Sequence, residues 1–535
     1  MDTLTIFHYH LLTGGISQVI SASLSALLSS ETDPPISGIQ LVCGSEKNAE
    51  AVSEEIRSAA ASAGREDLNV DLHVLPEIRY FSEMEEIPEP EKIKEMLLGR
   101  FGGGIWWVHN YHIGKNPLFT EALLRIAEKN REQRMVFHIH DFPESGRFNN
   151  LELLYSHIST GLYPLGPHIR YAVINGRDYS ILSEAGIPED CLFLLDNPVA
   201  PSGKSGPREE EENTDTDKEA GSPAGLVRDY CSSESSWWEE AGKLALYPIR
   251  SIKRKNVLEA GFLVRLLPRP VNLLVTLPGV SAQQEEYSDF VGKCFSEGLI
   301  PGAWPVGTQL DEIGLTFSQL IGASDIIVSS SIQEGFGYLF LNSLAWRKPL
   351  LSRDLDILDG MRGIFEGYPA QFYSSLLVPL TASGREKLLQ QYRERVLPVL
   401  TRVLSRRDVH KIEKELEDIC SRELVDFSYL SPELQRESLE RLFNPAYRKE
   451  VEDVNAALIE SLTAAMEERT VDKSGELEER FGPEAHAREL RRIIASVNTA
   501  YEGEYIGEHN GKCGKIHQKI LHMCTRTEYM RLLYF

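Results

Sequence analysis

The chain has 535 residues, of which 42% are hydrophobic, so it is long enough for two or more domains with sizeable cores. Its formal net charge of −24 argues against a nucleic-acid partner and against a broadly basic face that would bind membranes. Seven cysteines without a Cys-x-x-Cys pair indicate reduced thiols and not a disulfide framework. Because the start is not signal-like and no apolar run reaches about 18 residues, we expect a cytoplasmic protein without a membrane span.

The N-terminal part alternates short apolar strands with helices. Strands are expected at 4–7, 39–43, 70–75, 105–108, 135–141 and 171–174, and helices at 17–29, 49–61 and 90–98. This alternation predicts an α/β domain with a parallel, doubly wound sheet, whose ligands bind at the carboxyl ends of the strands. The domain is expected to cover residues 1–197.

Polar residues follow three of these strands. Gly14 and Gly15 form a turn after the first strand, where a backbone amide can approach a phosphate or a partner domain closely. His109 ends the fourth strand, and His138 and His140 lie two residues apart on the fifth, so both point the same way. Imidazoles at such a place can bond a ligand hydroxyl or transfer a proton, and a purely structural histidine is the alternative.

The composition changes abruptly after the first domain. Residues 201–236 are rich in Gly, Ser, Pro and acidic residues, which predicts a disordered acidic insertion. Its Asp215-Thr216-Asp217 matches a metal-binding pattern, but in such a context we interpret the match as chance. A second domain of strands and helices is expected at 240–400.

Two strand-to-helix turns in this second domain carry charge. The first turn places four cations within six residues, which suits a phosphate group: Arg250, Lys253, Arg254 and Lys255. The second, Glu334-Gly335-Phe336-Gly337, precedes an apolar helix, so its free amides and the helix dipole favour an anionic or polyhydroxylated ligand. Either turn alone could be a solvated surface or an ordinary helix start, and their pairing favours a ligand.

Arg250, Lys255 and the turn from Glu334 to Gly337 resemble the donor domain of retaining glycosyltransferases with the GT-B fold, of the family-four (glycosyl transferases group 1) type. The resemblance implies two Rossmann-like domains facing a cleft, with a nucleoside-diphosphate sugar as donor and a hydroxyl acceptor. It implies that Arg250 and Lys255 neutralise the diphosphate and that Glu334 contacts the sugar. Where the family has a second Glu for the ribose, this chain has Asn342, which can still bond a ribose hydroxyl.

The same resemblance assigns roles in the first domain. Gly15, with Gly14 beside it, contacts the diphosphate, and His140 lies next to the transferred sugar. The acceptor-side candidates are His109, His138 and Arg147. The expected catalytic set is His140, Glu334, Arg250 and Lys255. The expected donor-binding set is Gly14, Gly15, Arg250, Lys255, Glu334, Gly335, Phe336, Gly337 and Asn342. We expect no metal or other cofactor, because Arg250 and Lys255 take the place of a divalent cation.

Residues 401–535 are predicted to form a helical extension, longer than the family needs, through which a protein partner or a second copy could bind. The extension contains five histidines and cysteines whose spacing matches no standard zinc module: His509, Cys513, His517, His522 and Cys524. We therefore interpret them as part of an ordinary helical surface and not as a zinc site. The predicted function is retaining transfer of a hexose to a glycan, lipid-linked or small polar acceptor. The alternatives are a sugar-nucleotide epimerase or phosphorylase on the same fold, or a degenerate transferase acting as a scaffold.

Overall fold

The computed structural model describes residues 2–30, 36–199, 222–312, 314–498 and 509–535. The chain divides into two units, and each is described by itself. Unit 1 consists of Met1–Val199 and Glu478–Tyr529, and unit 2 consists of Ala200–Leu477 and Met530–Phe535. Within the described ranges, no helix combines the length and the apolar character that a membrane crossing requires.

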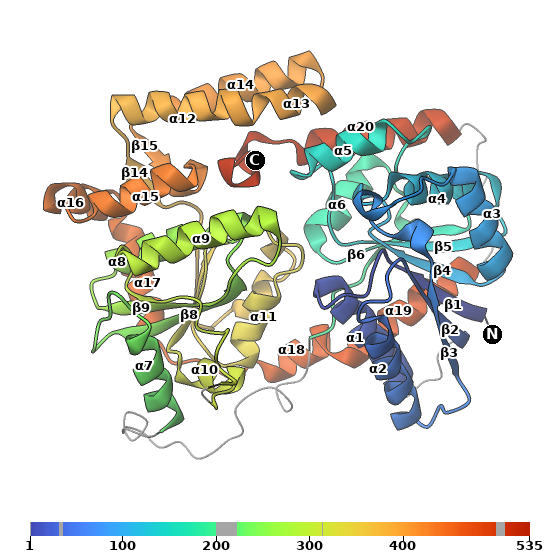
Figure 1. The fold of residues 1–535 in the computed structure, drawn as a ribbon, viewed down its shortest axis with the longest axis horizontal. Coiled ribbons are helices and arrows are strands. Elements are labelled where there is room, and N and C mark those ends of the chain that lie inside the picture. Colours follow the sequence, from blue (N-terminus) through green and yellow to red (C-terminus); the bar gives the residue numbers. More distant parts are fainter. Residues whose placement is uncertain (1, 31–35, 200–221, 313, 499–508) are drawn as a thin grey trace. The chain divides into compact units, whose positions relative to one another are not determined.

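Unit 1 is built on a parallel sheet of seven strands in the order β3-β2-β1-β4-β5-β6-β7 (Figure 1). The strands are β1 (Asp2–Phe7), β2 (Ile36–Cys43), β3 (Asn69–Val74), β4 (Ile105–His109), β5 (Arg134–Ile139), β6 (Ile169–Val173) and β7 (Leu192–Leu194). The helices are α1 (Gly15–Ser29), α2 (Ala49–Ser62), α3 (Pro90–Phe101), α4 (Pro117–Lys129), α5 (Phe148–Tyr155), α6 (Gly176–Ala185), α19 (Pro483–Asn498) and α20 (His509–Cys524). Each strand is joined to the next by a crossover connection, and all six pairings are parallel.

The core of unit 1 includes residues from the far end of the chain. Figure 1 shows α19 beside α1, and the two helices are in contact. Leu490, Ile493 and Ile494 of α19 are buried in the same apolar cluster as Leu4 and Ile6 of β1. The predicted extension at 401–535 is therefore not one separate part, since residues 478–529 belong to unit 1 and the rest to unit 2.

Unit 2 has a second parallel sheet, of six strands in the order β10-β9-β8-β11-β12-β13. The strands are β8 (Lys243–Arg250), β9 (Val271–Leu277), β10 (Gly302–Ala303), β11 (Ile326–Ser329), β12 (Leu350–Arg353) and β13 (Ala370–Tyr373). The helices among them are α7 (Pro223–Ser233), α8 (Val257–Leu266), α9 (Ala282–Ser296), α10 (Phe317–Ala323) and α11 (Tyr338–Ala345).

A mainly helical region follows the sheet of unit 2. It consists of α12 (Ala382–Arg395), α13 (Leu397–Val403), α14 (Arg406–Ser421), α15 (Pro432–Arg441), α16 (Pro445–Val454), α17 (Ala456–Glu467), the hairpin β14 (Leu377–Pro379) and β15 (Leu424–Asp426), and the start of α18 (Ser474–Phe481). The predicted fold class, two Rossmann-like parallel sheets with a helical C-terminal region, is confirmed.

Part of the predicted acidic insertion is folded. Residues 200–221, which include Asp215-Thr216-Asp217, lie outside the described residues. Residues 223–233 form α7, so the prediction of disorder is wrong for this part. The physical reason is burial: Val227 and Cys231 are completely covered, and α7 contacts α10.

Both sheets reverse their strand order at one point. The reversal lies between β1 and β4 in unit 1 and between β8 and β11 in unit 2. Ligands of doubly wound sheets bind outside the carboxyl ends of the strands at such a reversal. We therefore expect a ligand site at the loops after these four strands.

Candidate active site

In unit 2 the loops after β8 and β11 are bound to each other. The Ile332 N–H donates to the Arg254 carbonyl oxygen at 2.9 Å. The hydroxyl of the buried Tyr247 donates to the Lys255 carbonyl at 2.8 Å and lies 2.9 Å from the Ser331 hydroxyl. The basic turn and the glycine turn, about eighty residues apart in sequence, thus form one continuous surface.

Glu334 lies at the centre of this surface. Its carboxylate accepts hydrogen bonds from the Lys255 ammonium, from Arg254 Nη1 at 3.1 Å and from the Ser331 hydroxyl at 2.6 Å. Burial acts to raise the pKa of Glu334, but the Lys255 and Arg254 charges hold it at about 2. Burial lowers the pKa of Lys255 to about 8, against the opposing pull of Glu334. The site therefore has an ionised carboxylate beside a lysine that titrates close to neutral pH.

A buried polar network fixes the position of Lys255. The next residue, Asn256, adopts a left-handed conformation with φ of 48° and precedes the first residue of α8. Its side-chain amide donates to Glu259 Oε2 at 2.6 Å and accepts from Gln435 Nε2 at 2.9 Å. Glu259 in turn accepts from Arg353 Nε at 2.9 Å. Because these partners are buried and charged or amide groups, the basic turn is held in one conformation.

A cation outside the predicted donor set also reaches Glu334. Arg254, one of the four cations of the basic turn, contacts Glu334, whereas the exposed Arg250 at the end of β8 has no ion pair among the described residues. Gly337 has φ of 88°, and a Cβ there would lie 2.6 Å from the Phe340 ring, so the turn requires glycine. Asn342 follows on α11.

Gly14 and Gly15 are exposed at the carboxyl end of β1 in unit 1. The Gly14 N–H donates to Ser17 Oγ at 3.1 Å, which closes the turn into α1. A Cβ built on Gly15 would meet no atom within 4 Å. The packing of the described chain therefore does not require a glycine at Gly15.

The predicted histidines form a buried group at the ends of β4 and β5. His109 Nδ1 lies 3.0 Å from His140 Nε2, and the backbone N–H of His140 donates to Asn110 Oδ1 at 2.7 Å. His138 stacks on Trp107, and neither of its ring nitrogens has a hydrogen-bond partner in the described part of the chain. Burial lowers the pKa of His140 to about 4 and holds the pKa values of His109 and His138 well below their usual value, so all three are neutral.

The same three histidines are the ones among the described residues that could hold a metal ion. One ligand atom from each lies within 4.8 Å of the others. The neutral imidazole is the form that binds metals. The expectation of a metal-independent site remains a prediction.

The remaining candidates lie apart from this group. Arg147 is exposed at the N-cap of α5 and pairs with Asp141 at 2.9 Å. His517 of α20 is bonded to Tyr155 Oη at 3.0 Å and lies 3.6 Å from Glu144. Cys524 is buried. These contacts show that the end of α20 packs within unit 1; the side chains of His509 and Cys513 lie outside the described residues.

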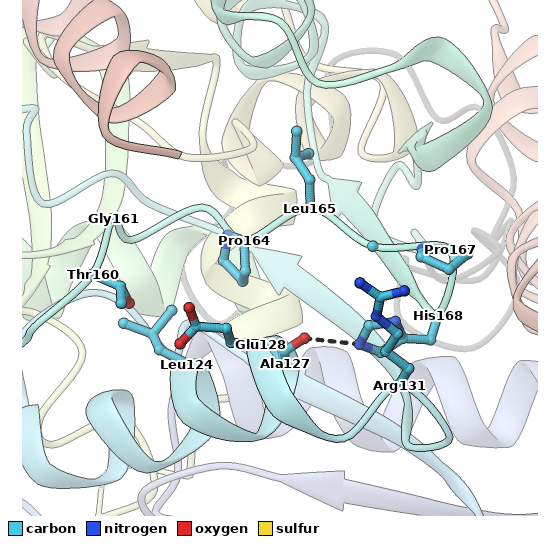
Figure 2. A pocket seen from close by; sticks show the side chains of 11 residues that line it. Leu124, Ala127, Glu128, Arg131, Thr160, Gly161, Pro164, Leu165, Pro167 and His168 are labelled. Atoms are coloured by element: carbon cyan, nitrogen blue, oxygen red, sulfur yellow. Dashed lines mark hydrogen bonds between the residues drawn. The ribbon is translucent and has the colours of Figure 1, made fainter. Parts of the chain in front are cut away.

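A small surface pocket lies at the other end of α4 (Figure 2). Its lining comes from the C-terminal half of α4 and the loop before β6, where His168 Nε2 contacts the Ala127 carbonyl at 3.0 Å. Since α4 runs back from the carboxyl end of β4, this pocket lies toward the amino-terminal edge of the sheet. It is therefore not at the strand reversal, and we assign it no role in the site.

No family model matches the chain. Mannosylglucosyl-3-phosphoglycerate synthase of Petrotoga mobilis is 30% identical over 504 residues, which cover 93% of this chain and 92% of the synthase. Among solved structures, Anabaena HepE in complex with UDP-glucose is 10% identical, with 93% of this chain and 100% of HepE covered at a TM-score of 0.48. Sucrose-phosphate synthase from Thermosynechococcus elongatus is 11% identical, with 86% and 100% covered at 0.43. The family assignment rests on the synthase, because that identity extends along nearly all of both chains.

Proposed function

The chain belongs to the GT-B glycosyltransferase family that includes the Petrotoga mobilis synthase, and we propose that it moves a hexose from a nucleoside-diphosphate sugar to a hydroxyl acceptor with retention of configuration. One observation carries the proposal. At the strand reversal of unit 2, Lys255 and Arg254 converge on the ionised Glu334, and the exposed Arg250 ends the strand that leads into this turn. This arrangement offers positive charge to a diphosphate and a carboxylate to a sugar hydroxyl.

In this proposal the cations stabilise the leaving group. The acceptor oxygen forms a bond to the anomeric carbon, the bond from that carbon to the β-phosphate oxygen breaks, and the nucleoside diphosphate leaves with the electron pair. The acceptor proton passes to the departing phosphate oxygen. Arg250, Arg254 and Lys255 neutralise the charge that develops there, as a divalent cation would elsewhere. Glu334 holds the sugar, Asn342 the ribose and Gly15 the diphosphate, and His140 contacts the sugar.

The relative suggests which substrates to try first. Its name describes a product in which a mannosyl group extends glucosyl-3-phosphoglycerate. Separating that product at the mannosyl linkage gives a mannose nucleotide as donor and glucosyl-3-phosphoglycerate as acceptor. We propose this acceptor class, a small sugar carrying a phosphate and a carboxylate, for the present chain.

The test is a product analysis with the full chain. GDP-mannose, UDP-glucose and ADP-glucose are each incubated with glucosyl-3-phosphoglycerate, without added metal, and the products are identified by mass spectrometry. The anomeric configuration is then read by NMR. Arg250→Ala and Lys255→Ala should lower turnover by about 100-fold or more while circular dichroism stays unchanged. Near-native turnover in both variants would refute the assignment, and an epimerised donor or a product made only with free phosphate would favour the epimerase or the phosphorylase.

A further inference from the structure

Four loops of unit 1 bring a second group of polar side chains together at the carboxyl ends of the strands. His10 follows β1, Tyr80 follows β3, Lys115 follows β4 and Arg147 follows β5. Lys115 Nζ lies 4.9 Å from the centre of the Tyr80 ring, and His10 Nε2 lies 2.8 Å from the Tyr80 hydroxyl. The charge of Arg147 acts on both Lys115 and Tyr80. We call these four residues the loop cation cluster.

Hydrogen bonds between the loops hold the cluster in place. The Phe81 N–H donates to the Lys115 carbonyl at 2.7 Å, which ties the Tyr80 segment to the loop after β4. Asn116 Nδ2 donates to the Arg79 carbonyl at 2.7 Å, and Asn116 Oδ1 caps α4. These bonds are made by the chain itself, so the cluster is formed before any ligand arrives.

The loop after β4 is also held against α5, the helix whose N-cap residue is Arg147. Gly114 has φ of 73°, and a Cβ there would lie 2.5 Å from the Asn150 carbonyl oxygen. Asn150 Nδ2 donates to the Ile113 carbonyl at 2.8 Å. The close approach of Gly114 therefore keeps Lys115 and Arg147 on neighbouring, mutually anchored segments.

The charges in the cluster are not balanced. Lys115 is half-buried, and no carboxylate of the described residues pairs with its ammonium. Burial, and after it the charge of Arg147, lower the pKa of Lys115; Glu83, which is exposed, acts in the opposite direction. Arg147 has one counter-ion, Asp141, at 2.9 Å. A half-buried ammonium beside a guanidinium is unfavourable until an anion lies between them.

The Tyr80 hydroxyl is arranged to donate. His10 Nδ1 accepts a hydrogen bond from the Leu12 N–H at 3.3 Å, so the ring proton is on Nε2 and is donated to the Tyr80 oxygen. The Tyr80 O–H proton is then directed at a further acceptor. Burial raises the pKa of Tyr80 and lowers the pKa of His10, which keeps the phenol protonated and the imidazole neutral.

We propose that the loop cation cluster binds the anionic group, a phosphate or a carboxylate, of the acceptor. Lys115, Arg147 and Tyr80 supply an ammonium, a guanidinium and a phenol O–H, the donors that bind such oxygens best. His10 orients Tyr80 and does not itself contact the anion. This inference rests on the proposed function and names the part of unit 1 that selects a charged acceptor over a neutral one.

The test compares three acceptors that differ in charge: glucosyl-3-phosphoglycerate, glucosylglycerate, which lacks the phosphate, and glucosylglyceramide, the uncharged amide. The variants are Lys115→Met, Lys115→Arg and Tyr80→Phe. Lys129→Gln is the matched control, since Lys129 is exposed at the C-terminal end of α4, the helix that follows the Lys115 loop. Binding of the donor nucleotide is measured separately for each variant by calorimetry.

Lys115→Met should lower kcat/KM for the acceptor bearing the recognised anion by about 10- to 100-fold, mainly through KM. Lys115→Arg should recover part of this loss, and nucleotide affinity should not change. If the difference in kcat/KM between glucosyl-3-phosphoglycerate and glucosylglycerate is smaller in Lys115→Met than in the unmodified chain, the phosphate is the bound group. If instead the difference in kcat/KM between glucosylglycerate and glucosylglyceramide is smaller in Lys115→Met, the carboxylate is the bound group.

If Lys115→Met behaves like Lys129→Gln, or lowers kcat/KM equally for all three acceptors, the loop cation cluster is not an anion site. Failure of the proposed function would look different, because the unmodified chain would then bind no nucleotide sugar. In that case calorimetry with 3-phosphoglycerate alone still tests the cluster, and equal binding by the unmodified chain and Lys115→Met would overturn the inference.

Discussion

Lys255 gives a prediction that depends on pH. Its ammonium is the part of the proposed diphosphate site that is closest to losing its charge, because burial lowers its pKa to about 8. Glu334, its partner, has a pKa of about 2 and stays ionised from pH 6 to pH 9. The arginines stay charged throughout this range. Any loss of positive charge in the turn between pH 7 and pH 9 therefore comes from Lys255.

The size of the effect follows from the pKa. With a pKa of about 8, about nine in ten Lys255 side chains are charged at pH 7 and about one in ten at pH 9. The sign is fixed: raising the pH removes positive charge, so an anionic diphosphate binds more weakly. If only the charged form binds, the dissociation constant of the nucleoside diphosphate rises about tenfold from pH 7 to pH 9.

Isothermal titration calorimetry at half-unit steps from pH 6 to pH 9.5 measures this constant directly. Lys255→Arg is the control, because arginine stays charged in this range and the variant also corrects for ionisation of the nucleotide base. The unmodified chain should lose affinity above pH 8 while Lys255→Arg loses little. Parallel curves for the two proteins would show that Lys255 does not set the charge of the diphosphate site.

Two further predictions concern unit 1. Gly15→Ala should leave the free energy of unfolding within about 0.5 kcal/mol of the unmodified chain, since its Cβ meets nothing, yet weaken nucleotide binding. Gly114→Ala should lower the free energy of unfolding by about 1–3 kcal/mol, because of the positive φ of Gly114 and the contact of the new Cβ with Asn150. Urea unfolding of both variants measures these changes, and a larger loss in Gly15→Ala than in Gly114→Ala would contradict the prediction. Glu144 is buried, and burial raises its pKa to about 7 in the folded chain. Its protonated form therefore stabilises the folded chain fully below the unfolded pKa near 4.5, and this contribution is lost as the pH rises through 7. Glu144→Gln should therefore match the unmodified chain at pH 5 and exceed it by about 1–3 kcal/mol at pH 8 in urea unfolding; equal stability at both pH values would contradict this.

The elements that carry the candidate site were predictable from local sequence. A strand, a turn and a helix each have a signal a few residues long, so the basic turn near Lys255 and the turn from Glu334 to Gly337 could be placed before their contact was known. Their meeting follows from the strand order, because β8 and β11 are neighbours at the reversal. Which cation reaches Glu334 did not follow, because it depends on the path of the chain at the end of β8, which runs to Arg250 and shifts register before it.

Contacts between distant segments could not be predicted from one sequence. The amphipathic pattern of residues 483–498 indicates a helix, but only the packing of Leu490 and Ile493 shows that it belongs to unit 1. Local composition also misled at Val227, whose burial outweighs the polar residues around it. Tyr80 and Lys115 are separated along the chain and are joined by hydrogen bonds between loops, for which there is no local signal.

The three buried histidines of unit 1 lead to the last prediction, which concerns metal ions. We expect the purified chain to transfer sugar equally well, within about twofold, after treatment with EDTA, because Arg254 and Lys255 already supply positive charge where a metal would act. His109 and His140 are also already bonded to each other at 3.0 Å. Mass spectrometry of the metal content before and after EDTA, with His138→Gln as the matched variant, measures both parts of this expectation. A stoichiometric transition metal that is lost in His138→Gln, together with activity that EDTA abolishes and zinc restores, would contradict it and would give the histidines a metal-binding role.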